Sequence, residues 1–146
     1  MGPAASIDGQ LMLFVVPPAH VCQAWKDGAY KLGIACDKAA GEVTGDQLKL
    51  LCIRGEKVLM GYRNEAGQTV AWIAISIDQH PNRRCLFVYA IWAPAATGQD
   101  AMQALKAFAQ AEGCDSIRGA CNEAVERLWA RKFRARRVYA IVEIEV

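Results

Sequence analysis

The side chains that could do chemistry in this chain are few, and they are spread along its length. None of the six cysteines forms a C-x-x-C motif, and His20 and His80 lie far apart in the sequence. Structural zinc sites need closely spaced ligand pairs, so we predict no metal site. We expect the cysteines to be reduced thiols of a cytoplasmic compartment. They are Cys22, Cys36, Cys52, Cys85, Cys114 and Cys121.

A group of cations near the end of the sequence, called the basic cluster below, could bind a partner. Three interpretations stay open: a solvated helix end next to the negative pole of the helix dipole, a docking patch for an acidic protein, or a phosphate contact with a coenzyme or nucleic acid. No aromatic interleaving supports base stacking, so we do not expect a nucleic-acid partner. The cluster consists of Arg127, Arg131, Lys132, Arg134, Arg136 and Arg137.

The length and composition indicate one domain over residues 1–146. Hydrophobic residues make up 53% of the chain and charged residues 22%, a globular composition that excludes disorder and coiled coil. The net charge of +2 does not by itself indicate binding to nucleic acid or to a membrane. The apolar run 11–16 is too short to span a membrane, so we predict no membrane partner. We expect residues 1–10 to form an extended N-terminal arm.

The elements that must position these side chains follow from the hydrophobic period. Residues 11–16 predict a strand, and apolar residues spaced by three or four over 21–36 predict a helix that Gly28 and Gly33 weaken. Thr44 and Gln47 have the spacing of a capping box, which predicts the start of a second, short helix. The runs 56–63, 69–77 and 84–92 predict three strands of an antiparallel meander.

The second half of the sequence alternates helices and strands. A helix with Met102, Leu105, Phe108 and Ala109 on one face is followed by a strand at 116–119 and a helix capped by Asn122. Within 136–146 every second residue from Val138 to Val146 is apolar, which predicts a last strand. The resulting order, β-α-α-β-β-β-α-β-α-β, predicts an α/β (α+β) fold with a central mixed sheet and helices on both faces. The connection from the fourth strand to 116–119 should be a parallel crossover.

This order resembles the GCN5-related N-acetyltransferase (GNAT) fold over nearly the whole chain. The most specific local similarity is the segment 109–114, AQAEGC, followed by a strand and the helical segment 124–133, AVERLWARKF. Members of this family often have a helix that ends in A-x-x-x-G, then a strand and a further helix with a tyrosine.

The resemblance implies a coenzyme A site where the fourth strand meets the long helix. In the family, a loop of the form [QR]-x-x-G-x-[GA] holds the pyrophosphate with backbone amides at a helix N-terminus. Here Pro94, Thr97 and Gln99 replace the three conserved residue types, so the motif is degraded, and Asp100 adds a negative charge that repels a pyrophosphate. If acetyl-CoA binds, the implied contacts are Ile91, Trp92, Ala93, Thr97, Gly98, Gln99 and Asp100.

The residues that the family uses for acid–base catalysis are also altered. Trp129 matches the usual tyrosine acid, and an indole does not release a proton to a leaving thiolate at neutral pH. Between Val70 and Trp92 the sole carboxylate is Asp78, at a strand end. Tyr62 and Tyr89 remain as candidates, although an unperturbed tyrosine has a pKa near 10.

Small GNAT-like proteins with a degraded loop, a tryptophan in this helix and a compact A-x-x-x-G-C segment look like those encoded by tailed bacteriophages. This resemblance implies a non-catalytic structural or assembly component of a virion, located in the virion or the host cytoplasm. It would have protein partners or form a homo-oligomer, and it would need no cofactor. The alternative is an acetyl-CoA-dependent N-acetyltransferase that acts on an unknown amine.

Overall fold

Five strands form one sheet with the order β1-β2-β3-β4-β5 in a computed structural model that describes residues 11–39, 41–94 and 98–146. All neighbouring pairs are antiparallel except β4 and β5, which are parallel. The predicted meander and parallel crossover are therefore confirmed. The strands are β1 (Met12–Val16), β2 (Val58–Arg63), β3 (Thr69–His80), β4 (Arg83–Trp92) and β5 (Ser116–Gly119).

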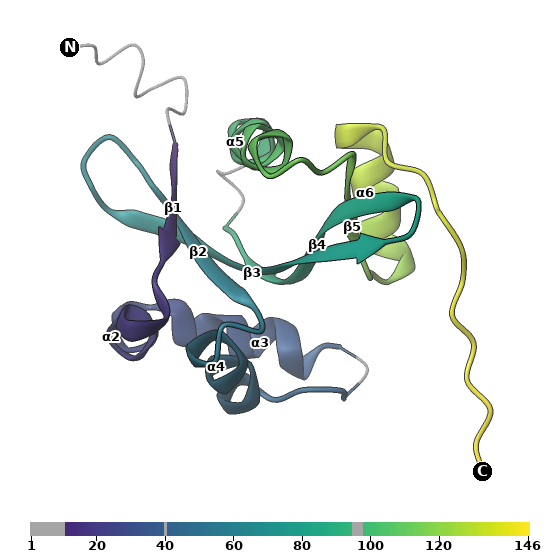
Figure 1. The fold of residues 1–146 in the computed structure, drawn as a ribbon, viewed down its shortest axis with the longest axis horizontal. Helices are drawn as coiled ribbons and strands as arrows, with labels where there is room; N and C mark the ends of the chain where they lie inside the picture. Colours follow the sequence, from purple (N-terminus) through teal and green to yellow (C-terminus); the bar gives the residue numbers. More distant parts are fainter. Residues whose placement is uncertain (1–10, 40, 95–97) are drawn as a thin grey trace.

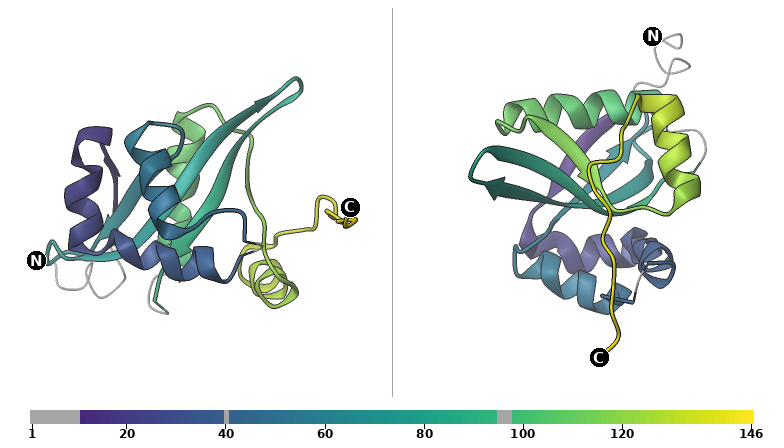
Figure 2. Two further views of the ribbon diagram at one scale, coloured as in Figure 1. Left: turned by 90° about the horizontal axis from the view of Figure 1, so that it is seen from below. Right: turned by 90° about the vertical axis from the view of Figure 1, so that its right-hand side faces the viewer.

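Helices cover both faces of the sheet, as Figure 1 and Figure 2 show. One face carries α2 (Val21–Asp27), α3 (Leu32–Asp37) and α4 (Gly45–Ile53). A short 3-10 turn, η1 (Pro18–His20), precedes α2, and another, η2 (Ala29–Lys31), joins α2 to α3. The other face carries α5 (Gly98–Ala111) and, beside β5, α6 (Glu123–Phe133). The mixed α/β class expected from the sequence is confirmed. The expected arm over 1–10 lies outside the described residues.

The predicted first helix is interrupted at Gly28. This residue has φ +156°, and a Cβ placed on it would lie 2.9 Å from Nε1 of Trp72. Glycine is therefore required by the backbone conformation and by the close approach of the β3 indole. The capping box at the start of α4 is confirmed, because the Thr44 hydroxyl accepts from the Gln47 N–H while the Gln47 side chain accepts from the Thr44 N–H.

Two apolar cores lie on the two faces of the sheet. The first joins Trp25, Leu32 and Leu48 of the early helices to Leu59 and Trp72. The second joins the opposite faces of β2, β3 and β4 to α5, which buries Ala101, Leu105 and Ala109. The predicted apolar face of α5 is right, with Leu105 and Ala109 buried and Met102 and Phe108 half-buried.

The last predicted strand is not formed. Residues 136–146 run as an extended trace beside the domain after α6 (Figure 1), without secondary structure and with exposed side chains. The alternation of apolar residues describes a segment suited to a sheet, but a strand also needs a neighbour for its backbone hydrogen bonds. No backbone hydrogen bond joins 136–146 to the rest of the described chain. The element order observed therefore ends at α6.

Candidate functional site

β4 and β5 separate part-way along β4. The two strands are paired from Cys85–Ser116 to Val88–Gly119, and beyond that point β4 continues to Trp92 with no described strand beside it on this side. The separation lies at the carboxyl ends of parallel strands, where ligands of open α/β sheets bind. If the chain is an acetyltransferase, the opening is expected next to Trp92 and Ser116. Trp92 does lie at the open end, whereas Ser116 lies at the closed end because it pairs with Cys85.

A β-bulge distorts β4 at this point. Ala74 pairs with Ala90 and the next β3 residue, Ile75, pairs with Val88, so Tyr89 is an extra residue in β4. A bulge leaves backbone groups unpaired and is common next to binding sites. The half-buried Tyr89 side chain packs against the core under α2–α4, with Lys57 Nζ 4.3 Å from its ring centre. Burial raises its pKa, and the negative charge of Glu42 adds to this, so Tyr89 is a poor base.

The predicted coenzyme contacts gather where β4 ends and α5 begins. Ile91 is exposed and Trp92 half-buried, with Lys31 Nζ 4.3 Å from the Trp92 ring centre. Ala93 and Asp100 are exposed, and Asp100 lies in the first turn of α5. Thr97 lies outside the described residues, as do 95 and 96.

The end of α6 lies against the start of α5. Gln99 Nε2 donates to the Lys132 carbonyl at 2.7 Å, and Lys132 Nζ lies 3.6 Å from the place where a Cβ on Gly98 would stand. One member of the basic cluster is thus beside a helix N-terminus, where the dipole also favours anions. The sequence did not predict this contact, because the two residues lie far apart along the chain.

Tyr62 is not available for proton transfer. Its side chain is 1% exposed, and its hydroxyl donates to the Ala101 carbonyl in the first turn of α5 at 2.8 Å. Burial raises the pKa of the phenol far above its ordinary value. Asp78 is also unsuited, because it pairs across the sheet with Cys85 at the closed end and accepts from the Ser76 hydroxyl at 2.9 Å.

Trp129 lies against the end of β5. Its ring is 3.6 Å from a Cβ placed on Gly119, the last residue of β5, and it meets Phe133 edge-on with 5.9 Å between ring centres. A large side chain at position 119 would displace the indole. The tryptophan therefore fills space at the end of β5 and offers no group that ionises there.

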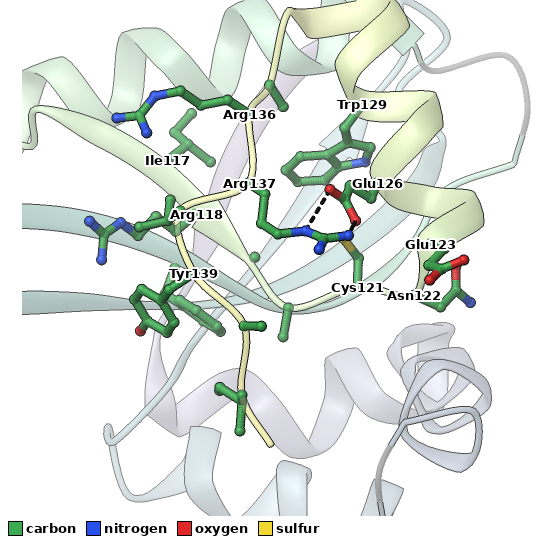
Figure 3. Close-up of a pocket in the computed structure, with 17 residues that line it drawn as sticks. Ile117, Arg118, Cys121, Asn122, Glu123, Glu126, Trp129, Arg136, Arg137 and Tyr139 are labelled. Atoms are coloured by element: carbon green, nitrogen blue, oxygen red, sulfur yellow. Dashed lines mark hydrogen bonds and ion pairs between the residues drawn. The ribbon is translucent and has the colours of Figure 1, made fainter. Parts of the chain in front are cut away.

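A cavity of about 620 Å³ lies between β5, the start of α6 and the segment that follows α6 (Figure 3). Across it, Arg137 donates two hydrogen bonds to the Glu126 carboxylate, at 2.7 and 2.9 Å. This pairing holds the pKa of Glu126 below its usual value. The cavity could not be predicted from the sequence, because residues 136–146, which line it in part, were expected to pair as a strand of the sheet.

The other members of the basic cluster are solvent-exposed, and they line α6 and the chain just after it. Arg131 and Lys132 stand in the last turn of α6, in agreement with a favourable helix dipole. Among the six residues of the basic cluster, only Arg137 forms an ion pair within the described residues. The cluster therefore leaves most of its charge directed to solvent.

Neither thiol chemistry nor a metal site is supported. All six cysteines are free, as expected, and burial raises the pKa of Cys52 to about 11. The described residues contain no group of three potential metal ligands, and they contain no helix long and apolar enough to cross a membrane.

Solved structures of acetyltransferases share the fold of this chain. No protein-family model and no curated protein matches the sequence. Among solved structures, an aminoglycoside acetyltransferase from an uncultured soil metagenomic sample, in complex with sisomicin, aligns with 96% of this chain and 99% of its own at 11% identity and TM-score 0.65. A ribosomal-protein-alanine N-acetyltransferase from Brucella melitensis aligns with 93% of this chain and 99% of its own at 12% identity and TM-score 0.64.

The fold is GNAT-like. At such low identity a GNAT-like fold does not establish the activity of the neighbours for this chain, because one fold supports many functions.

Proposed function

We propose that this GNAT-like chain is a non-catalytic assembly protein that acts by binding protein partners. The observation that carries the proposal is what surrounds the candidate acid–base residues. Trp129 replaces the tyrosine acid and packs on Gly119, while Tyr62 is buried and bonded to α5. Neither group can take a proton from an amine or give one to a thiolate near neutral pH.

The assembly in which we place the protein is a tailed-bacteriophage virion. This part of the proposal is supported by the resemblance of the degraded loop, of Trp129 and of the AQAEGC segment to small phage-encoded proteins. The exposed basic cluster supports docking to an acidic protein surface.

A second candidate function, acetyl-CoA-dependent N-acetylation, is favoured by a different observation. The strands part beyond Val88–Gly119, and Lys132 lies beside Gly98 at the start of α5. The backbone of 91–93 would hold the pantetheine arm, and the start of α5 with Lys132 would hold the pyrophosphate. The coenzyme would supply a thioester: its carbonyl carbon bonds to the amine nitrogen, the C–S bond breaks, and the thiolate takes the proton that the nitrogen loses.

Titration calorimetry with acetyl-CoA and CoA, combined with an assay for thiol release in the presence of a panel of amines, separates the two functions. We expect no binding at millimolar ligand and no thiol release. Micromolar binding together with turnover would overturn the non-catalytic proposal. In that case Lys132→Ala should weaken the binding of acetyl-CoA. Arg127→Ala is the control and should leave it unchanged, because Arg127 is an exposed cation more than one turn earlier on α6.

A further inference from the structure

The segment 138–146, called the tail below, exposes an unusual amount of apolar surface. Six of the twelve exposed large hydrophobic residues in the described chain fall within it, and its β-branched members at 141, 142 and 144 are 83–86% exposed. Soluble monomers seldom leave a contiguous apolar segment uncovered. The six are Val138, Tyr139, Ile141, Val142, Ile144 and Val146.

The tail also has the pattern of a strand without a partner. Val138, Ala140 and Val142 alternate with Tyr139 and Ile141, and β-branched residues dominate. The described backbone makes no hydrogen bonds over this segment. The tail therefore has the extended form and the composition of a β-strand, but its backbone has no neighbouring strand to hydrogen-bond with.

An unpaired sheet edge lies close by. β5 is the last strand in the sheet order, so its outer edge has no partner among the described strands. The cavity of about 620 Å³ separates this edge from the chain that leaves α6 (Figure 3). Across that cavity Arg137, just before the tail, donates two hydrogen bonds to Glu126 of α6. No backbone hydrogen bond joins the tail to its own β5 in the described chain.

Charge on the two surfaces is complementary. Arg118 of β5 and Arg136 have no ion-pair partner in the described chain, and Figure 3 shows both side chains on the same side of the tail root. Glu143 and Glu145 of the tail carry the opposite charge. Opposite charges on neighbouring strands stabilise their pairing and help to fix its register.

We propose that the tail pairs as a β-strand with the outer edge of β5 in a second copy of this chain. A reciprocal exchange uses the same two surfaces on both copies, so it closes as a two-fold dimer. It supplies the backbone partner that each tail and each edge lacks and covers the apolar residues. This inference rests on the assembly role proposed above and specifies one partner in it.

Sedimentation equilibrium of the full chain over a range of micromolar concentrations tests the proposal. We expect a monomer–dimer equilibrium. Val142→Pro removes a backbone donor and should abolish the dimer, whereas Val142→Ile, which keeps β-branching, should retain it. Because Val142 is 86% exposed in the monomer, circular dichroism and thermal melts of both variants should match those of the original chain at low protein concentration, where any dimer dissociates.

Charge reversal tests whether β5 is the surface that the tail meets. Arg118→Glu should raise the dimer dissociation constant about three-fold or more. Combining it with Glu143→Arg and Glu145→Arg should restore the original value. A dimer that is indifferent to both Val142→Pro and Arg118→Glu would overturn the proposal.

Two other outcomes also overturn it. One is a monomer at every concentration. The other is a monomer whose tail amides are protected from hydrogen exchange, because that tail would have folded onto its own β5. Neither outcome bears on the acetyl-CoA titration, so failure of this inference is distinguishable from failure of the non-catalytic role.

Discussion

The hydroxyl of Tyr62 joins strand β2 to helix α5, and this contact explains why a residue suited to acid–base chemistry does none here. Its partner is the Ala101 carbonyl, which belongs to the first turn of α5. The Tyr62 side chain thus helps to hold α5, the helix that follows β4. The sequence identified Tyr62 as a candidate by its residue type, but only the packing of α5 on β2 decides what the hydroxyl faces.

Replacing Tyr62 with phenylalanine should lower the free energy of unfolding by about 1 kcal/mol, the usual net value of one buried hydrogen bond. Urea denaturation measures this change. Ala101 keeps its helical hydrogen bonding, so we expect no rearrangement of the sheet. A loss within experimental error would mean that the hydroxyl contributes nothing to holding α5.

The same variant changes the pH dependence of stability. Burial raises the pKa of the folded Tyr62 above the unfolded value near 10. The neutral phenol is therefore favoured in the fold, and its contribution is present below about pH 10 and lost as the pH rises through the folded pKa. Above pH 10 the stability of Tyr62→Phe should fall less steeply than that of the original chain. Parallel slopes would contradict a buried, neutral Tyr62.

Strand β2 shows how close packing between elements depends on a single glycine. A Cβ on Gly61 would stand 2.5 Å from the Phe14 ring of β1, which also carries Arg63 at 4.0 Å and meets Trp72 edge-on. The period of two predicted this strand correctly. It did not predict which residue must stay small, because that depends on the register of β1 against β2.

Gly61→Ala should therefore destabilise the protein by roughly 1–3 kcal/mol, the cost of overpacking a filled site. Gly33→Ala, in α3, is the matched control, because its Cβ would make only an ordinary contact, 3.7 Å from the Cα of Gly45 in α4. Alanine is a better helix former than glycine, so this control should be neutral or stabilising by up to about 1 kcal/mol. Equal loss in both variants, measured by thermal melts, would argue against the Phe14 contact.

The segment 136–146 marks the limit of what a local pattern can predict. Helix caps at Thr44 and Asn122 were predicted correctly because a cap involves residues three positions apart. A strand needs a second edge at the right place, and nothing in eleven alternating residues specifies one. The pattern predicted an extended segment with the composition of a strand. The prediction that this segment pairs with a strand of the same chain was wrong.

At the scale of the whole molecule, the sequence predicted the sheet and the helices that cover it. It did not predict the details of the region where β4, β5, α5 and α6 meet. Periodicity is enough to order strands and helices, since each buries one face in a core. The open end of β4 depends instead on the end of pairing at Gly119 and on the bulge at Tyr89, and Lys132 docks beside Gly98. These are relations between distant residues, which spacing along one chain does not encode.

The distribution of burial predicts unequal stability across the fold. Six consecutive residues of β3, from Ala71 to Ser76, are buried and the strand is paired on both sides, whereas α6 has no fully buried residue. Elements with little buried apolar surface open without global unfolding. We expect the amides of α6 to exchange with solvent at least about tenfold faster than those of β3.

Hydrogen exchange followed by mass spectrometry at low protein concentration, where any dimer dissociates, measures this difference. Helix α5 is the internal control, because it buries Ala101, Leu105 and Ala109 and should exchange nearly as slowly as β3. If α6 exchanged as slowly as β3, it would belong to the cooperative core, and its half-buried Leu128 and Trp129 would contribute more than their exposure indicates. Fast exchange of α6 would instead mean that this helix separates readily from the end of β5 in the monomer, because Trp129 packs there against Gly119.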